Sequence, residues 1–304
     1  MNARSLLWLR AGRVFWHVMR GVVTAFWVLP WADQRLRGHL IQNWARQLMH
    51  LLQITVDLQQ GHMPEPGTPP FILTSNHISW VDIFVIHSAC PVRFVSKAEV
   101  RQWPVLGWLA AKTGTLFLHR ASRRQTATIG REMEAVLRGG DCLGLFPEST
   151  TSDGSGVLPF RTSLLQPAVR METPVLPIAL HYSLTSGGAN PHIPFVGDMT
   201  FAQSLLMVLT SPPSRANILI GAMIRPTPHE HRRELALQLE NTTRNLLNAW
   251  MSALRGGIAA HRAPETAPGL PDAPPSDARP TGIPYPVPAH WNPDVDPTPT
   301  SARK

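Results

Sequence analysis

Short apolar runs alternate with amphipathic stretches through the middle of the chain. Six of these runs have the length and composition of strands: residues 71–75, 93–96, 114–118, 142–146, 175–182 and 217–224. Four other stretches have apolar residues at helical spacing: residues 79–89, 122–138, 160–171 and 229–254. Alternation of this kind is typical of an α/β domain with a central sheet. We therefore predict one such domain over about 61–255.

The first 60 residues have a different pattern, which is basic and rich in tryptophan. Arg10, Arg13, His17 and Arg20 recur at spacings of three and four, which places them on one face of a helix. A second amphipathic stretch follows at about 36–48. Such a pair fits helices that lie in an anionic membrane face. The alternative is a pair of surface helices whose Arg stems cover apolar area of the core. We favour amphipathic membrane-binding helices for residues 1–60.

No stretch is predicted to cross a membrane as a helix or to be a cleaved signal. The apolar run between Arg20 and Asp33 has about twelve residues, which is short of the ~20 that a membrane-spanning helix needs. Arg10, Arg13 and Arg20 would also interrupt the apolar region of a signal peptide. We therefore expect the chain to associate with the membrane as a monotopic or peripheral protein.

Composition narrows the class of protein and the kind of partner. With 43% hydrophobic residues the chain can build a core, which excludes global disorder. The net charge of +8 comes mostly from Arg, which indicates an anionic partner or, equally, a GC-rich genome. Cys90 and Cys142 have no metal-ligand spacing and suggest a reducing compartment. The proline-rich segment 256–304 is predicted to be a disordered tail, with docking through Tyr285 and Trp291 as the alternative.

The candidate chemistry begins in the stretch TSNHISWVDIFV, where His77 precedes Asp82 by five positions. A neutral imidazole suits proton removal from an alcohol, and a carboxylate on its other nitrogen fixes the tautomer. Residues five apart on a helix point about 140° apart, so the pair needs a turn, which an N-cap at Ser79 would supply. Alternatively, Asp82 only completes a capping box with Ser79. The motif alone does not decide, because chance matches are frequent.

Three further blocks follow in order: Lys97-Ala98-Glu99 with WPVLGW and GTLFLHR, then LFPESTTSDG at 145–154, then Val175-Leu176-Pro177-Ile178. Together with NHISWVD they resemble the glycerolipid acyltransferase family, whose best-known members are 1-acylglycerol-3-phosphate acyltransferases. The resemblance covers about 60–230. It implies an α/β fold of that family's type, a single domain with a mixed central sheet flanked by helices and preceded by an N-terminal membrane-associated helix pair.

The resemblance also assigns roles. The family's histidine is the general base and its aspartate orients it, which implies these roles for His77 and Asp82. Implied substrate-binding positions are Asn76, Lys97, Arg120, Glu148, Ser149, Thr150, Thr151 and Arg161. Lys97 and Arg120 match positions that bind the acceptor head or the donor phosphates, and Glu148 matches a residue that positions the acceptor. The alternatives are surface charge for the two cations and a helix-start charge for Glu148. Pro177 matches a proline that shapes the site floor, or is a strand-edge proline.

Two positions depart from the family's common FPEGTR. Thr151 replaces the arginine that contacts the acceptor's phosphate, which suggests an acceptor without a phosphate monoester, or compensation by Arg161. Ser149 replaces a glycine, a residue favoured where φ is positive or a ligand approaches closely. The run from Phe146 to Ala168 resembles the lyso-ornithine lipid acyltransferase branch, whose members esterify a hydroxyl on the fatty chain of an amino-acid lipid.

The expected function is thus a membrane-associated O-acyltransferase at the cytoplasmic face of a bacterial inner membrane. It would use an acyl carrier protein or coenzyme A thioester as co-substrate, with no metal, no other cofactor and no covalent acyl-enzyme. Lyso-ornithine lipid is the favoured acceptor. The alternatives are 1-acylglycerol-3-phosphate acylation or a decayed lipid-binding homologue. A serine hydrolase would need a G-x-S-x-G elbow, which is absent. Nucleic-acid binding is disfavoured because the basic residues lie among Trp and Leu.

Overall fold

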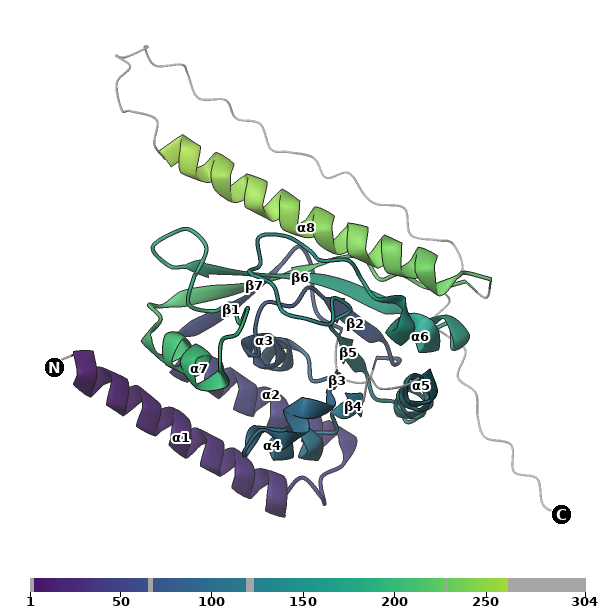
Figure 1. Cartoon of the computed structure of the whole chain (residues 1–304), viewed down its shortest axis with the longest axis horizontal. Coiled ribbons are helices and arrows are strands. Elements are labelled where there is room, and N and C mark those ends of the chain that lie inside the picture. The colour runs from purple at the N-terminus through teal and green to yellow at the C-terminus, as the bar shows by residue number, and fades with distance from the viewer. Residues whose placement is uncertain (1–2, 65–67, 119–122, 228, 262–304) are drawn as a thin grey trace, which may run out of the picture. The chain divides into compact units, whose positions relative to one another are not determined.

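The computed structural model describes residues 3–64, 68–118, 123–227 and 229–261. Seven strands in this part of the chain form one sheet in the order β1-β7-β6-β2-β5-β3-β4 (Figure 1). The strands are β1 Ile54–Gln59, β2 Ile72–Ser75, β3 Arg93–Lys97, β4 Leu116–Leu118, β5 Leu143–Leu145, β6 Val175–Leu184 and β7 Ser214–Ile220. Strands β6 and β7 are antiparallel and the other pairs are parallel, which confirms the predicted mixed sheet.

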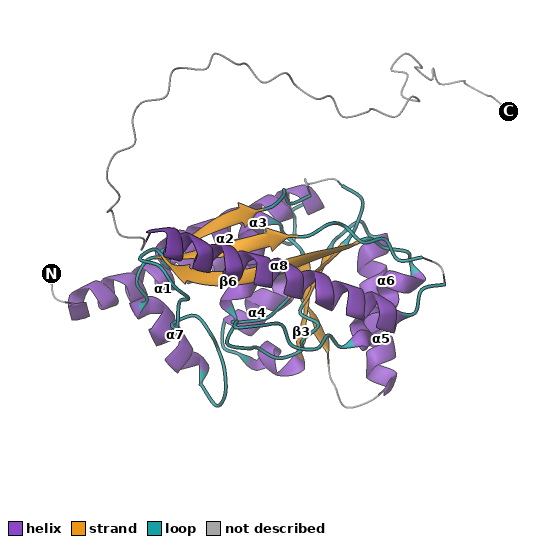
Figure 2. Ribbon diagram, turned by 90° about the horizontal axis from the view of Figure 1, so that it is seen from above, coloured by secondary structure: helices purple, strands orange, loops and turns teal. Residues whose placement is uncertain are grey.

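Helices cover both faces of this sheet (Figures 1 and 2). They are α1 Ala3–Trp27, α2 Gln34–Leu51, α3 Val81–Ala89, α4 Leu106–Lys112, α5 Arg123–Arg138, α6 Gln166–Arg170, α7 Phe201–Thr210 and α8 Arg232–His261. Two short 3-10 helices, η1 Ala98–Gln102 and η2 Thr162–Leu165, complete the description. Helix α8 packs on β6 and β7, while α2 and α3 pack together on the opposite face and contact β1.

The side chains of strand β6 enter two hydrophobic cores, one on each face of the sheet. Leu176, Ile178 and Leu180 face the core that contains α2 and α3, whereas Val175 and Ala179 face the core that contains α8. Successive side chains of a strand point to opposite faces, so a strand covered on both sides needs an almost continuous apolar run. That requirement explains why β2, β5 and β6 are recognisable in the sequence.

The predicted helix pair is present at the N-terminus. The Asp33 carboxylate caps α2 by accepting the Leu36 N–H at 2.7 Å. His17 of α1 stacks on Trp44 of α2 with ring centroids 4.8 Å apart, and the Trp44 indole donates to the His17 carbonyl at 3.2 Å. Helix α1 also contacts α4 and α7. Within the described ranges, no helix has the length and apolar character to cross a membrane.

Some elements were not predicted from the sequence. β1 is an edge strand that pairs only with β7 and has one buried residue, Ile54, among partly or fully exposed ones, so it lacks a continuous apolar run. Helix α4 has only seven residues, and α7 is apolar on most of its surface, which hides the helical period. Helix α8 continues to His261, past the predicted boundary at 255, and the remainder of the predicted tail lies outside the described residues.

Candidate active site

The candidate site lies where three parallel strands end. His77 follows β2, Phe146 follows β5, and Lys97 is the last residue of β3. Strand β5 lies between β2 and β3 and is parallel to both, so the carboxyl ends of the three strands meet at one edge of the sheet. Open α/β sheets bind their ligands in a crevice at this edge. The fold therefore brings together blocks that are far apart in the sequence.

His77 and Asp82 form a hydrogen-bonded pair. His77 Nδ1 lies 2.8 Å from Asp82 Oδ2. The same oxygen accepts the backbone N–H groups of Ile78 at 2.7 Å and Ser79 at 3.0 Å, and Oδ1 accepts the hydroxyl of Tyr182 at 2.7 Å. Asp82 has no exposed surface. Four donors converge on this carboxylate, which compensates for its loss of water.

Asp82 makes contacts that each of its two interpretations expects. Its carboxylate accepts the Ser79 N–H, as in a capping box, and it also accepts His77. The prediction that Ser79 is the N-cap is wrong: α3 begins at Val81, and the buried Ser79 Oγ has no hydrogen-bond partner among the described residues. The carboxylate reaches back over the turn, so the serine hydroxyl is not needed to cap the helix.

The loop after β5 holds His77 from the other side. The His77 ring stacks on Phe146 with centroids 3.9 Å apart and an interplanar angle of 12°. The His77 carbonyl accepts the Ser152 N–H at 2.8 Å, and its own N–H donates to Glu148 at 3.3 Å. Since Nδ1 contacts Asp82, Nε2 is the ring nitrogen left for a substrate. The side chain is 19% exposed and lines a cavity, here named the His77 cavity.

Glu148 is a buried residue that links two loops. Its carboxylate accepts the N–H of His77 and the N–H of Leu158, the latter at 3.0 Å. Burial raises the pKa of Glu148 to about 7, against the opposing effect of these two hydrogen bonds. It is not among the residues that line the His77 cavity. This arrangement gives Glu148 a positioning role, and its expected contact with the acceptor stays a prediction.

Four other predicted residues do line the His77 cavity: Lys97, Ser149, Thr150 and Thr151. Ser149 has a φ of 62°, which meets one of the two conditions under which glycine is favoured at this position. The Thr151 hydroxyl donates to the carbonyl of Phe195, so it anchors the loop across the cavity. Lys97 is the only cation among the described residues that line the cavity.

The remaining predicted residues lie elsewhere. Asn76 is fully buried; its Oδ1 accepts the Leu180 N–H at 2.7 Å and its Nδ2 donates to the Leu180 carbonyl at 3.1 Å. These bonds tie the end of β2 to β6. Arg161 is exposed and is not on the cavity wall, although its N–H donates to the carbonyl of Pro147 at 2.9 Å. Arg120 lies outside the described residues.

The structure adds residues that the sequence analysis missed. Tyr182 reaches Asp82 from β6, and Phe146 supports the imidazole. No local pattern marks Tyr182, because its partner lies 100 positions away. Pro177 lies within β6 where the pairing with β7 stops, since Ile178 pairs with Ile220, the last residue of β7. Among the described residues, no three His, Cys, Asp or Glu side chains are grouped to hold a metal.

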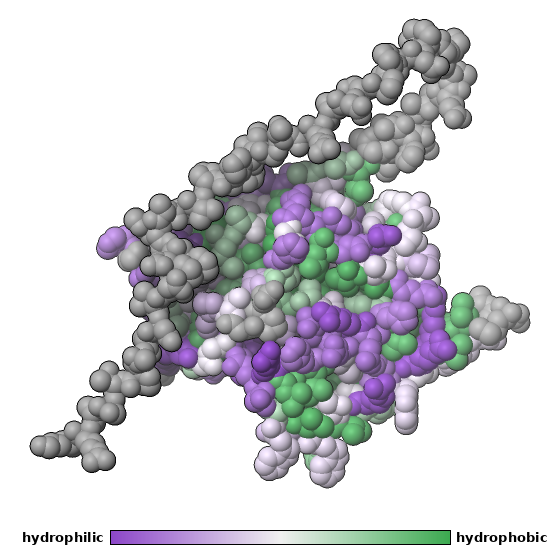
Figure 3. Space-filling model, turned by 180° about the vertical axis from the view of Figure 1, so that it is seen from behind, coloured by the Kyte–Doolittle hydropathy of each residue, from purple (hydrophilic) through white to green (hydrophobic). Residues whose placement is uncertain are grey.

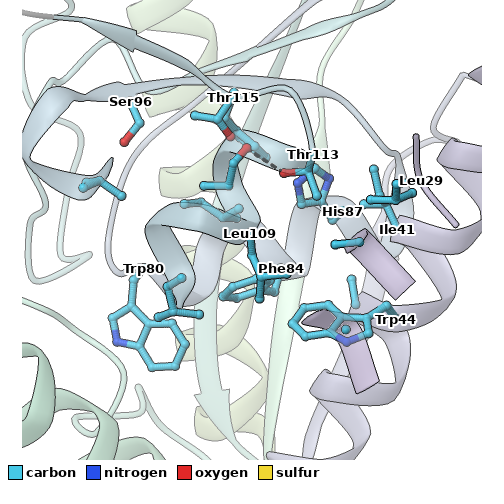
Figure 4. Close-up of a pocket in the computed structure, with 18 of the residues that line it drawn as sticks. Leu29, Ile41, Trp44, Trp80, Phe84, His87, Ser96, Leu109, Thr113 and Thr115 are labelled. Atoms are coloured by element: carbon cyan, nitrogen blue, oxygen red, sulfur yellow. Dashed lines mark hydrogen bonds between the residues drawn. The ribbon is translucent and has the colours of Figure 1, made fainter. Parts of the chain in front are cut away.

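A second cavity, here named the apolar cavity, adjoins the first. Figure 4 shows residues that line it. It lies among α1, α2, α3, η1 and α4. Its wall is mostly apolar, and it shares six residues with the His77 cavity: Trp80, Ile83, Phe94, Ser96, Val100 and Trp103. A largely apolar space therefore leads away from the His77–Asp82 pair.

Comparison with known proteins identifies the family. Residues 55–181 match the family model described as Acyltransferase. A lyso-ornithine lipid O-acyltransferase of Pseudomonas aeruginosa is 35% identical over 250 residues, covering 80% of this chain and 93% of the relative. The chain belongs to the acyltransferase family. These matches confirm the family and the enzyme class that the sequence motifs predicted.

Other relatives of this acyltransferase have two kinds of name. A Rhizobium meliloti lyso-ornithine lipid O-acyltransferase is 31% identical and covers 82% of this chain and 88% of itself. A 1-acyl-sn-glycerol-3-phosphate acyltransferase of Neisseria gonorrhoeae is 39% identical, but over 43% of this chain and 52% of itself. The crystal structure of a 1-acyl-sn-glycerophosphate acyltransferase from Thermotoga maritima has the same fold, with a TM-score of 0.58, 22% identity, and coverage of 80% and 98%.

Proposed function

We propose that this acyltransferase transfers a fatty acyl group from an acyl thioester to the hydroxyl of a lysolipid, and that lyso-ornithine lipid is the acceptor. The thioester is carried by acyl carrier protein or coenzyme A. One observation carries the proposal: His77, paired with the buried Asp82, lines a cavity that joins a largely apolar one. A base beside an apolar space suits a substrate with a reacting hydroxyl and a long hydrocarbon chain.

The chemistry follows from the pair. The acceptor hydroxyl donates a hydrogen bond to His77 Nε2, and its proton moves to that nitrogen as the oxygen attacks the thioester carbonyl. Asp82 contacts Nδ1 at 2.8 Å and stabilises the imidazolium that forms. The tetrahedral intermediate then collapses and the carbon–sulfur bond breaks. The departing thiolate takes the proton from Nε2 and leaves as a thiol. The base returns to its starting state, and the acyl group passes directly between the substrates.

The acceptor is argued from the His77 cavity. Thr151 stands where an arginine would clamp a phosphate, and its hydroxyl is engaged with Phe195. Lys97 alone, among the described lining residues, presents a positive charge. A phosphate monoester carries close to two charges at neutral pH and favours bidentate Arg. Relatives named as lyso-ornithine lipid O-acyltransferases also align over most of their length. The alternative acceptor, 1-acylglycerol-3-phosphate, is supported by Lys97 and by the Neisseria relative.

Membrane association is argued from α1. Its exposed large apolar side chains include Trp8, Phe15, Trp16, Val23, Phe26 and Trp27, and Trp31 follows at 88% exposure. Helices α1 and α2 contain several Arg and no acidic residue. Figure 3 shows apolar side chains gathered at the lower edge of the molecule, beneath a hydrophilic band. Exposed Trp with Arg matches helices that lie in the headgroup region of an anionic membrane. We place the enzyme on the cytoplasmic face of a bacterial inner membrane.

The test is acyl transfer by the protein reconstituted in vesicles. Labelled acyl carrier protein and coenzyme A thioesters are offered with lyso-ornithine lipid and lysophosphatidic acid in competition. We expect product on the amino-acid lipid, and a fall of about 10²- to 10⁴-fold in His77→Ala. His62→Ala, which changes an exposed histidine outside the site, is the matched control. Near-normal transfer by His77→Ala would refute the mechanism, and product on lysophosphatidic acid alone would refute the acceptor.

A further inference from the structure

The apolar cavity has one polar side. In Figure 4, His87, Ser96, Thr113 and Thr115 lie along one side of it, across from Trp80, Phe84 and Trp44. The four residues come from α3, β3, the end of α4 and the segment before β4. A cavity that holds only a saturated chain gains nothing from polar groups in its wall, because hydrocarbon offers them no hydrogen bond.

His87 is the unusual member of this group. It lies in the last turn of α3, is 6% exposed, and meets Phe94 edge-on at 5.0 Å between ring centroids. Its Nδ1 is buried and has no hydrogen-bond partner among the described residues. Burial lowers the pKa of His87 to about 4, so the ring is neutral at pH 7. A buried polar atom without a partner costs stability and needs an explanation.

A neutral imidazole has one donor and one acceptor nitrogen. A hydroxyl group can satisfy either nitrogen, whereas a methylene group satisfies neither. A carboxylate or phosphate at this position would be buried in a mostly apolar wall without a cation, which is much more costly than burial of a hydroxyl. The neighbouring Thr113 hydroxyl donates its proton to the Ala110 carbonyl at 3.0 Å, so that proton is not available to His87.

We propose that His87 binds a hydroxyl group carried on the acyl chain that occupies the apolar cavity, and so selects hydroxylated chains. This inference rests on the proposed function, because it takes the occupant to be a chain of one of the two lipid substrates. The hydroxyl is distinct from the one that reacts at His77. It belongs to the chain of the thioester donor or to the chain of the acceptor, and the chemistry at His87 is the same in both cases.

The experiment compares saturated and hydroxylated chains of equal length, with the hydroxyl moved stepwise along the chain. One series places it on the donor and the other on the acceptor, which separates the two sources. We expect one position in one series to raise kcat/KM by about 5- to 150-fold, the factor that corresponds to pairing one buried polar group. Equal use of saturated and hydroxylated chains at every position would overturn the proposal.

Two variants locate the effect. His87→Phe removes the nitrogens, so the ratio of kcat/KM for hydroxylated over saturated chains should fall to about one. Its melting temperature should be equal or higher, because no satisfied hydrogen bond is lost. His181→Phe is the matched control: His181 is also buried, but its Nδ1 accepts the Trp250 indole N–H at 3.3 Å, and it does not line the cavity. A preference that persists in His87→Phe would refute the role of His87.

Binding of thioether analogues separates this inference from the proposed function. These analogues carry the same chains but cannot transfer them, and their dissociation constants can be measured on the wild-type protein. A preference in binding without any transfer from true thioesters would support the His87 site and overturn the proposed reaction. Transfer that shows no chain preference, in binding or in turnover, would support the proposed reaction and overturn the His87 site.

Discussion

Removing the hydroxyl of Tyr182 tests whether the buried carboxylate beside His77 depends on a residue from a distant strand. The hydroxyl donates to Asp82 Oδ1 at 2.7 Å, and both residues are buried. Burial, together with the Asp82 charge, raises the pKa of Tyr182 well above its ordinary value, so the phenol always keeps its proton. Tyr182→Phe retains the ring and its packing, and it removes one donor without opening a large cavity.

The expected loss follows from the kind of bond. A hydrogen bond to a charged group contributes about 1.5–3 kcal/mol, and here water cannot replace the lost donor because Asp82 has no exposed surface. For a domain of this size, 1 kcal/mol corresponds to about 2–4 °C, so the melting temperature should fall by roughly 3–12 °C. Acyl transfer should fall less than in His77→Ala, because Asp82 keeps its contacts with His77, Ile78 and Ser79.

The assay is thermal unfolding of the purified protein in one detergent, followed by initial rates of transfer at saturating donor. Tyr285→Phe is the control, because it makes the same chemical change at the only other tyrosine of the chain. An Asp82→Asn variant should lose more activity than Tyr182→Phe. If Tyr182→Phe melts within 1 °C of the wild type, the bond contributes nothing measurable and the reasoning about Asp82 fails.

Two further predictions concern the loop after β5. Ser149→Gly should raise the melting temperature by up to roughly 6 °C and preserve turnover. Relief of the positive φ is worth about 1–2 kcal/mol, which equals or exceeds the ~0.5–1 kcal/mol entropic cost of glycine. A large loss of transfer, with Ser155→Gly unaffected, would contradict this. Glu148 holds a proton in the folded state up to a pKa of about 7, which the unfolded chain releases near 4.5, so its contribution to stability falls as pH rises between these values. In Glu148→Gln, about 3 kcal/mol of that pH dependence should vanish from urea unfolding measured at pH 4.5 and 7.5; equal slopes in both proteins would refute the assignment.

Burial decides which parts of the fold the sequence predicts. Strands β2, β5 and β6 are covered on both faces, so they appear as apolar runs and were predicted to within a few residues. The edge strand β1 has one neighbour and a half-exposed face, and its mixture of polar and apolar residues has no distinctive pattern. The strand order also needs the three-dimensional structure, because no local pattern states that β6 lies between β2 and β7.

Only part of the candidate site could be predicted from the sequence. His77 and Asp82 are five positions apart and were predicted as a pair, while Tyr182 completes the Asp82 environment from 100 positions away and was missed. The departure at Ser149 was visible in the sequence, but its positive φ is a property of the folded loop. The wall of the apolar cavity comes from five helices, from β3 and from the segment before β4, and no single element has a sequence signature of it.

The two acids near His77 differ in their environments, and this difference supports a single base with a single counter-ion. Asp82 receives four donors and contacts the ring nitrogen, so it carries the negative charge that an imidazolium needs. Glu148 receives two backbone N–H groups, and its pKa of about 7 keeps a large fraction of it protonated at neutral pH. The different contacts of these two neighbouring carboxyl groups separate their roles. Glu148 then holds the backbone of His77 in place, and Asp82 alone stabilises the charge that develops on its ring.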